Sequence, residues 1–331
     1  LPSGFVGLQE VGRMMEVLYS LVFPGVLFTA AMAFWFEYID RKVTALVQRR
    51  VGPQATGPGG LLQPLYDFLK LLGKEELVSE KADKVALRVG PVLAVTLPIY
   101  GMLYIPIVST DPPLGFSGDL LLIFLLLAFS ALSVALVGYA ALSPYTVLGV
   151  GRFIAQYAMY EAVFMLCLVS AALQASTLSV SGLVTYQAAR GWLALYQPIG
   201  FVAALLSLLA KLEKKPFDLP HAKQEIVAGW ATELSGRSLA FMRLYEDLSM
   251  TWGIALLATV YLGGPLGPGF PELGPLAGFA WFGLKTFTLS VLVALISASM
   301  ARVRVYGLVK TFWERTLLLV LLQIGLAWLL R

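Results

Sequence analysis

The chain has very little cysteine, histidine and charge for its length. Its 331 residues include one cysteine, Cys167, and one histidine, His221. A single cysteine excludes an intrachain disulfide, a zinc finger and an iron–sulfur cluster ligated by this chain, and one histidine leaves no ligand pair for a metal or haem. Only 13% of the residues are charged, 58% are hydrophobic and the mean hydropathy is +0.79. Because a soluble domain carries roughly 25% charged residues, this composition indicates an integral membrane protein.

Hydrophobic runs of about 20 residues, the length that crosses a bilayer as a helix, recur along the whole chain. They lie at 17–39, 86–107, 119–142, 153–174, 194–213, 247–264, 276–298 and 313–330. The alternation typical of barrel strands is absent, so these runs are expected to be helices. The sequence predicts an all-α, polytopic membrane helix bundle with about eight transmembrane helices, forming a single integral membrane domain over residues 1–331. Segment 1–16 is weakly amphipathic, and we expect it to lie along the membrane interface.

Basic residues are distributed unevenly between the two sides of these spans. With eight spans the loops alternate sides, and 19 of the 24 Lys and Arg residues fall in the loops after spans 1, 3, 5 and 7. Positive charge gathers on the cytoplasmic side of membrane proteins, so we expect a multi-pass protein of the cell membrane with these four loops in the cytoplasm and both termini outside. The net charge of +4 follows from this asymmetry. The sequence contains no basic domain, so the charge does not indicate nucleic-acid binding.

The predicted loop at 40–85 is long and partly amphipathic. Its leucines and Phe68 fall on one face of a helix through 60–72, which is expected to lie at the membrane interface. Basic residues, among them Arg49 and Arg50, precede it. Two interpretations stay open: a basic loop that adheres to lipid headgroups, or a platform on which a cytoplasmic protein docks.

A few ionisable residues fall within or beside the spans. Glu161 lies inside span 4 and Lys285 inside span 7, while Asp40, Lys211 and Glu213 lie at span ends. A charge at mid-helix depth costs about 2.5–3.5 kcal/mol on insertion scales, so a functional role is expected. For Glu161 we favour proton relay over a carboxyl held only by helix hydrogen bonds. Lys285 is expected to extend to the interface or to pair with a buried acid.

The stretch 212–237 places many charges between two apolar runs. Pro216 and Pro220 are expected to break the helix of span 5, with Asp218 capping a new turn. The next helix is predicted to carry four residues on one side, His221, Gln224, Glu225 and Ala228. His221 is either a solvated cap or a proton relay. Loops 40–85 and 213–246 are therefore predicted to serve docking and coupling.

Seven strings in order connect the chain with a known family. They are DRK at 40–42, QRRVGP at 48–53, GLLQPLYDFLKLL at 60–72, SPYTVLGVGR at 143–152 with Glu161 nine residues on, KPFDLPHAKQEIVAG at 215–229, TELSG at 232–236 and SMARVRV at 299–305. Together they resemble the H-type membrane subunit of complex I and of the related energy-converting membrane-bound hydrogenases, over nearly the whole chain.

The resemblance implies a subunit that seats a peripheral electron-transfer arm and couples its redox chemistry to proton or sodium translocation. It implies a peripheral hydrogenase-like or quinone-reductase-like subunit, an iron–sulfur subunit and antiporter-like membrane subunits as partners, with the iron–sulfur clusters, and nickel–iron in a hydrogenase, held by those partners. No catalytic or metal-binding residue is expected in this chain. The predicted coupling residues are Asp40, Arg41, Asp67, Arg152, Glu161, Lys211, Glu213, Asp218, His221, Glu225 and Glu233, with Arg49 and Arg50 for docking.

Some positions depart from the quinone-reducing branch of that family. Lys211, His221 and Lys223 stand where those members usually carry acids, and the third span contains no Glu. We therefore favour an energy-converting hydrogenase or a ferredoxin-linked sulfur reductase, and a quinone stays open as a partner but is not favoured. The alternative is the H-type quinone-site subunit of NADH:quinone oxidoreductase, complex I. Two other classes stay open, a stand-alone secondary ion transporter, which would also need broken helices, and a purely structural anchor.

Overall fold

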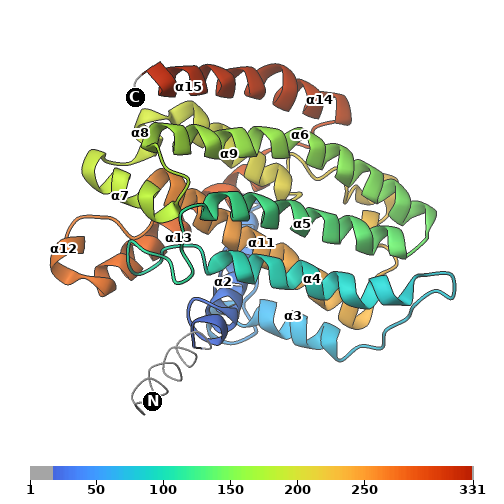
Figure 1. Ribbon diagram of the computed structural model, residues 1–331. Coiled ribbons are helices and arrows are strands. Elements are labelled where there is room, and N and C mark those ends of the chain that lie inside the picture. The colour runs from blue at the N-terminus through green and yellow to red at the C-terminus, as the bar shows by residue number, and fades with distance from the viewer. Residues whose placement is uncertain (1–17, 330–331) are drawn as a thin grey trace, which may run out of the picture.

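The computed structural model describes residues 18–329, and all regular structure in that part of the chain is helical (Figure 1). The longer helices are α2 (Val26–Val47), α3 (Gln63–Leu72), α4 (Lys84–Met102), α5 (Asp119–Ala140), α6 (Pro144–Ala175), α7 (Val180–Arg190), α9 (Pro198–Lys211), α11 (Gly236–Leu262), α13 (Pro275–Ser299) and α15 (Leu317–Leu329). The short ones are η1 (Pro58–Gly60), α8 (Leu193–Tyr196), α10 (Lys223–Ile226), η2 (Gly229–Ala231), α12 (Phe270–Leu273), α14 (Val305–Val309) and the π-helix η3 (Lys310–Thr316). The predicted all-α membrane bundle is confirmed; the expectation for segment 1–16 falls outside the described residues.

Within residues 18–329, five helical stretches are long and apolar enough to cross a membrane. They are Leu18–Val47, Lys84–Met102, Asp119–Ala140, Pro144–Ala175 and Pro275–Ser299. The other three predicted spans are also helical but differ in form. Span 194–213 is divided between α8 and the 14-residue α9, span 247–264 is the second half of α11, and span 313–330 is shared by η3 and α15. The number of eight spans therefore stays a prediction.

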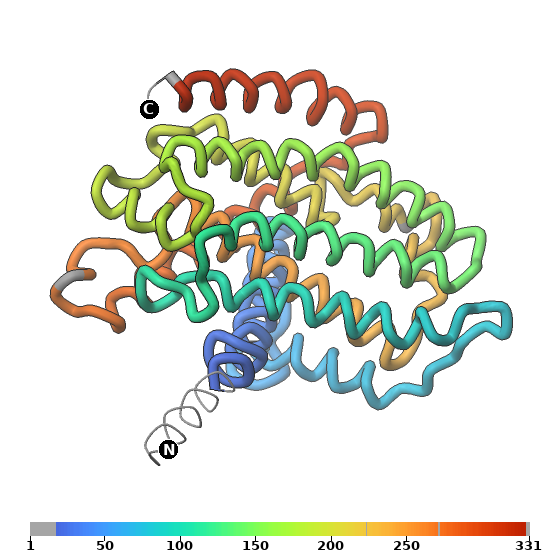
Figure 2. Tube along the Cα trace, viewed as in Figure 1, coloured from blue at the N-terminus to red at the C-terminus, as the bar shows by residue number. Residues whose placement is uncertain are grey.

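The long helices are stacked side by side with their loops gathered at two ends. Figures 1 and 2 show α4, α5 and α6 side by side with nearly parallel axes and alternating chain direction, and α2 crossing them. α4 packs on α5 and α11, α6 packs on α9 and α15, and α2 packs on α13. Loop 73–83 and the turn at 141–143 lie at one end, which we call the loop end, while α7 and α12 lie at the other.

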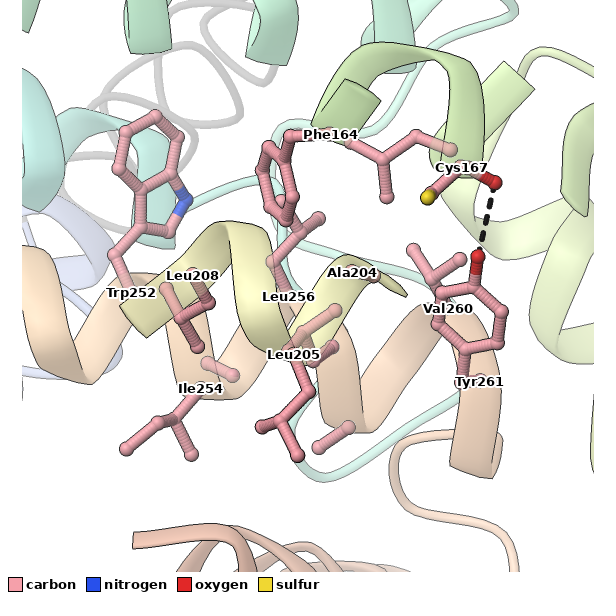
Figure 3. Packing of buried hydrophobic residues seen from close by; sticks show 14 of the residues in the cluster. Phe164, Cys167, Ala204, Leu205, Leu208, Trp252, Ile254, Leu256, Val260 and Tyr261 are labelled. Atoms are coloured by element: carbon pink, nitrogen blue, oxygen red, sulfur yellow. Dashed lines mark hydrogen bonds between the residues drawn. The ribbon is translucent and has the colours of Figure 1, made fainter. Parts of the chain in front are cut away.

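Helix α11 is charged at its start and buried at its end. Residues 248–261 are all buried, and a helix that is apolar on every side must be enclosed by others. Figure 3 shows this packing: Trp252 of α11 lies near Leu208 of α9 and Phe164 of α6, and the Tyr261 hydroxyl donates to the Cys167 carbonyl at 2.9 Å. The first turns of α11 instead bring charged side chains to the candidate functional site.

Among the described residues, Lys285 does not pair with a buried acid, which was one of the two possibilities expected from sequence. Its side chain is buried, and its Nζ donates to three backbone carbonyls, of Leu262 at 2.5 Å, Gly264 at 2.9 Å and Leu266 at 2.5 Å. These carbonyls end α11 and begin the following loop, where a cation is favourable. Lys285 thus ties α13 to the C-terminal end of α11.

Candidate functional site

A cavity of about 340 Å³ opens between α2, α3 and α11. Its lining combines aromatic rings, of Phe34 and Phe68, with a majority of ionisable side chains. The ionisable ones are Glu37, Arg41, Asp67, Lys70, Arg243, Glu246 and Asp247. The two phenylalanine rings lie 6.0 Å apart, so one part of the wall is apolar and the rest is charged. Such a mixture suits a ligand with a polar head and an apolar body.

Arg41 connects α2 to α3 across this cavity. Its Nε is 2.6 Å from Glu37 Oε1 and its Nη1 is 2.6 Å from Asp67 Oδ2. Gln63 Nε2 also donates to Asp67 Oδ1 at 2.8 Å. Partial burial alone would raise the pKa of Asp67, but the hydrogen bonds from Arg41 and Gln63 hold that pKa below its usual value. The predicted amphipathic helix at 60–72 is present as α3. The ion pairs of Arg41 with Glu37 and Asp67 hold α3 against α2.

Lys214 joins the 212–235 loop to the end of α2. Its Nζ lies 2.7 Å from Asp40 Oδ2, and both side chains are largely buried. Burial would lower the pKa of Lys214, yet the nearby carboxylates of Asp40 and Glu37 raise it, so the lysine stays charged. Asp40 was predicted from sequence, whereas Lys214 was not, because one of two adjacent lysines in LEKK carries no distinguishing signal.

His221 lies between two carboxylates and against an aromatic ring. Its Nε2 is 3.1 Å from Glu213 Oε2 and 3.6 Å from Glu246 Oε1, and its ring centroid is 5.1 Å from that of Trp230. Trp230 Nε1 donates to the same Glu213 oxygen at 3.0 Å. Burial would lower the pKa of His221, but the charge and hydrogen bond of Glu213, supported by Glu246, raise it to about 9. His221 is therefore an imidazolium at neutral pH.

The prediction of a helix after the break at Pro216 and Pro220 was wrong about the length of that helix. Only α10, four residues long, forms there, and Val227 then adopts a positive φ of 62°. His221 precedes α10 and contacts Glu213 and the cavity-lining Glu246, whereas Glu225 contacts arginines elsewhere. The two residues do not share a helix face, because α10 begins only at Lys223, after His221.

Glu161 and Lys211 lie deeper in the bundle. Both are buried, at 5% and 6% exposure, and neither has a hydrogen-bond partner among the described residues. They interact electrostatically with one another, although no ion pair within 4 Å joins them. Tyr160, also buried, lies within electrostatic range of both Glu161 and Glu213. Tyr160 therefore shares the electrostatic surroundings of Glu161 and of the Glu213 carboxylate beside His221.

A second ionic group holds the loop from the side of α6. We call Arg152, Asp218, Glu225 and Arg302 the loop-anchor cluster. Arg152 Nη1 bonds to Glu225 Oε2, and this guanidinium lowers the pKa of Glu225 below its usual value. Arg302 Nε lies 3.4 Å from Asp218 Oδ1 and its Nη1 lies 3.6 Å from Glu225 Oε1. Sequence reasoning named the first three residues but not Arg302, which appeared only within the SMARVRV string.

Gln156 and Gly149 of α6 seat the loop and were also missed. Gln156 is 1% exposed, and its Nε2 donates to the carbonyls of Ala210 at 2.6 Å and Phe217 at 2.7 Å. A Cβ at Gly149 would lie 2.4 Å from the backbone nitrogen of Trp230. Gly149 therefore lets η2 approach α6 closely, which brings Trp230 beside His221.

Three predicted residues lie apart from these groups. Glu233 is exposed and forms no ion pair within the described part of the chain, and it borders a small cavity of about 10 Å³ with Glu76. Arg49 and Arg50 are exposed just after α2, where Arg50 Nε donates to Gln48 Oε1 at 2.8 Å. Both arginines remain available for a partner surface.

The arrangement supplies charge and proton-bearing groups but no metal ligand set. Between residues 18 and 329, no three His, Cys, Asp or Glu side chains gather so as to hold a metal ion. The ionisable groups extend from the cavity through Asp40 and Lys214 to Glu213 and His221, and then to Glu161 and Lys211. Such a series can pass an electrostatic change from the loop end into the bundle.

Comparisons with known proteins agree over nearly the whole chain. The family model described as NADH dehydrogenase matches residues 19–328. The H subunit of the NADH-quinone oxidoreductase of Methylococcus capsulatus is 34% identical over 305 residues, which is 92% of this chain and 95% of the relative. An H subunit of the same oxidoreductase from Geobacter sulfurreducens is 34% identical over 97% of this chain and 95% of its own, and the one from Thermomicrobium roseum is 36% identical over 90% of each.

Proposed function

This chain belongs to the NADH dehydrogenase family, and we propose that it is the H-type membrane subunit of an NADH-quinone oxidoreductase. In this proposal it anchors a peripheral arm at the loop end, contributes to the quinone site and couples electron transfer to ion translocation. The observation that carries it is the continuity between the cavity of about 340 Å³ and the ionisable series that runs inward to Glu161.

The composition of the cavity supports quinone binding. The aromatic part, formed by Phe34 and Phe68, suits an apolar ring and tail, while the carboxylates and guanidinium groups opposite suit a head whose charge changes on reduction. Lys211 and His221 replace acids of the quinone-reducing members, and this replacement argued against a quinone. Neither is among the described residues that line this cavity. The acids Glu37, Asp67 and Glu246 remain in its wall.

The relatives also favour this branch over the one preferred from sequence. All three carry names that make them H subunits of NADH-quinone oxidoreductases. None of the observations adds support for a hydrogenase or a sulfur reductase. We accordingly place complex I first, with iron–sulfur clusters in partner subunits, antiporter-like membrane subunits beside this one and the loop end in the cytoplasm.

The packing beyond Glu161 argues against a stand-alone transporter. After Glu161, α6 continues with Phe164, Cys167 and Leu168, which are fully buried against apolar residues of α9 and α11 (Figure 3). A dry, close-packed core offers no hydrated route along the helix. The ionisable series therefore suits transfer of charge to neighbouring subunits.

A purely structural anchor is also disfavoured. It would not explain why the chain keeps Glu161 and Lys211 buried despite the free-energy cost of burying ionisable groups.

A photoreactive ubiquinone tests the quinone assignment in the intact complex. We expect light-dependent labelling of peptides that contain residues 34–41, 64–71 or 243–247, and loss of the label when unmodified quinone is added in excess. Replacement of Asp67 by Asn should weaken labelling and raise the KM for quinone, because it removes one arm of the Arg41 bridge.

Glu80→Gln supplies the matched control. Glu80, like Asp67, lies between α2 and α4, but it is an exposed acid that does not line the cavity. Competed label confined to the apolar cavity of about 260 Å³ between α6 and α14 would contradict the proposed position. Equal effects of the two substitutions would contradict the role given to Asp67.

A further inference from the structure

An extended segment far along the chain lies against the broken turn of the 212–235 loop. Residues 300–304 join α13 to α14, and the Val303 amide donates to the Pro216 carbonyl at 2.9 Å. The rings of Phe217 and Phe312 are 5.1 Å apart, and both are buried. The turn at 216–219 is thus held by the chain that leads into α14 and η3 as well as by α6.

Arg302 supplies the polar part of this contact. Its guanidinium donates to the Leu219 carbonyl at 3.4 Å and lies within ion-pair distance of Asp218 Oδ1 at 3.4 Å and Glu225 Oε1 at 3.6 Å. A planar guanidinium has donors in several fixed directions, so a single side chain can contact acceptors seven residues apart in sequence. The side chains of Arg302 and Asp218 are 25% and 23% exposed, so their ion pair is of moderate strength, whereas Glu225 is 53% exposed and its pair with Arg302 is weaker.

Glu225 is held from two sides. One carboxylate oxygen bonds to Arg152 of α6, and the other faces Arg302. After Arg152, α6 carries Gln156, which donates to the Phe217 carbonyl, and then Glu161. Arg302 therefore contacts the same loop that α6 contacts, but from an element more than 140 residues later in the chain.

We propose that Arg302 is a positioning residue that fixes the 216–225 part of the loop against α6, so that events at the cavity reach Glu161 through a rigid connection. The inference rests on the proposed function, because it assigns to the 300–304 segment the task of holding the coupling loop. It also explains why the loop, which contains only one turn of helix, keeps a defined path: its carbonyls at Pro216, Phe217 and Leu219 each receive a donor from another element.

Arg302→Gln in the intact complex tests this assignment, with Arg304→Gln as the matched control. Arg304 is exposed and forms no ion pair within the described residues. Hydrogen exchange of the amides in 217–225 should rise about fivefold in R302Q, the factor that corresponds to ~1 kcal/mol, and stay unchanged in R304Q. Ions moved per electron should fall in R302Q, while the KM for quinone stays within about twofold of the wild-type value, because Arg302 does not line the quinone cavity.

Two more variants separate positioning by charge from general packing. R302K keeps the positive charge and one donor group, so it should recover part of the coupling that R302Q loses. R152Q combined with R302Q should lose more than the product of the single losses, because only the double variant leaves Glu225 without any guanidinium.

Equal behaviour of R302Q and R304Q, or equal loss in R302Q and R302K, would overturn the positioning role. Either result would leave the proposed function standing if the complex still reduced quinone. A chain that never assembles with an electron-transfer arm would instead overturn the proposed function itself.

Discussion

Glu213→Gln is predicted to change the charge state of His221. In the wild-type protein the pKa of His221 is raised from 6.5 to about 9, mainly because the Glu213 carboxylate offsets the effect of burial. At about 1.36 kcal/mol for each pKa unit, this shift corresponds to about 3 kcal/mol in favour of the imidazolium. Glu213 is 8% exposed at its side chain, so solvent screens the pair only weakly.

Removing the Glu213 charge leaves burial and the Arg243 guanidinium opposed by Glu246 alone. We expect the pKa of His221 to fall by at least about one unit in E213Q, because the largest of the effects that raise it is lost. The raised pKa of His221 also determines how the stability of the protein changes with pH. A histidine pKa raised by folding stabilises the protein fully below pH ~6.5, and that stabilisation is lost as the pH rises through about 9.

Deuterium exchange at the imidazole Cε1, followed by mass spectrometry, measures this pKa directly. His221 is the only histidine of the chain, so one peptide reports it without interference. Glu233→Gln is the matched control, because Glu233 is exposed and has no ion pair among residues 18–329. A wild-type midpoint near 6.5, or the same midpoint in wild type and E213Q, would refute the arrangement of Glu213 beside His221.

Three other changes follow from the same structure. Glu161→Gln should leave the complex assembled and reducing quinone but lower the ions moved per electron, measured in proteoliposomes; full pumping would contradict a relay role for this buried carboxyl. Gly149→Val should displace η2, since a Cβ there meets the Trp230 backbone at 2.4 Å, and the melting temperature should fall by several degrees, as expected for an overpacking cost of ~1–3 kcal/mol. Joint replacement of Arg49 and Arg50 by Gln should reduce co-purification of the peripheral arm. The melting temperature should change little, because both side chains are exposed. Undiminished co-purification would argue against docking at these arginines.

Hydropathy was enough to predict the helical bundle, because the length and apolar character of a span depend on local sequence alone. The same holds for α3, whose leucines repeat with helical period. The limits of the elements were harder to predict. The break at Gln197 precedes Pro198, a local helix-start signal that the hydropathy of 194–213 does not show. No hydropathy pattern in 313–330 signals the seven-residue π-helix η3.

Charged residues could be located by sequence, but their partners could not. The positions of Asp40, Glu161, Asp218 and Glu225 were expected to matter, and the structure places them in three groups with different partners. Which base meets which acid depends on how far the chain turns between them. His221 and Glu225 were expected on one helix face, yet a short α10 sends them to different groups.

The most direct test of the central claim is to purify the complex from its native membrane through a tag on this chain and to measure its electron acceptor. The account predicts NADH-dependent quinone reduction that is inhibited by quinone-site inhibitors, with iron–sulfur subunits and antiporter-like subunits in the preparation. Hydrogen evolution by a co-purified nickel–iron subunit, or a chain that is isolated without any electron-transfer partner, would contradict it.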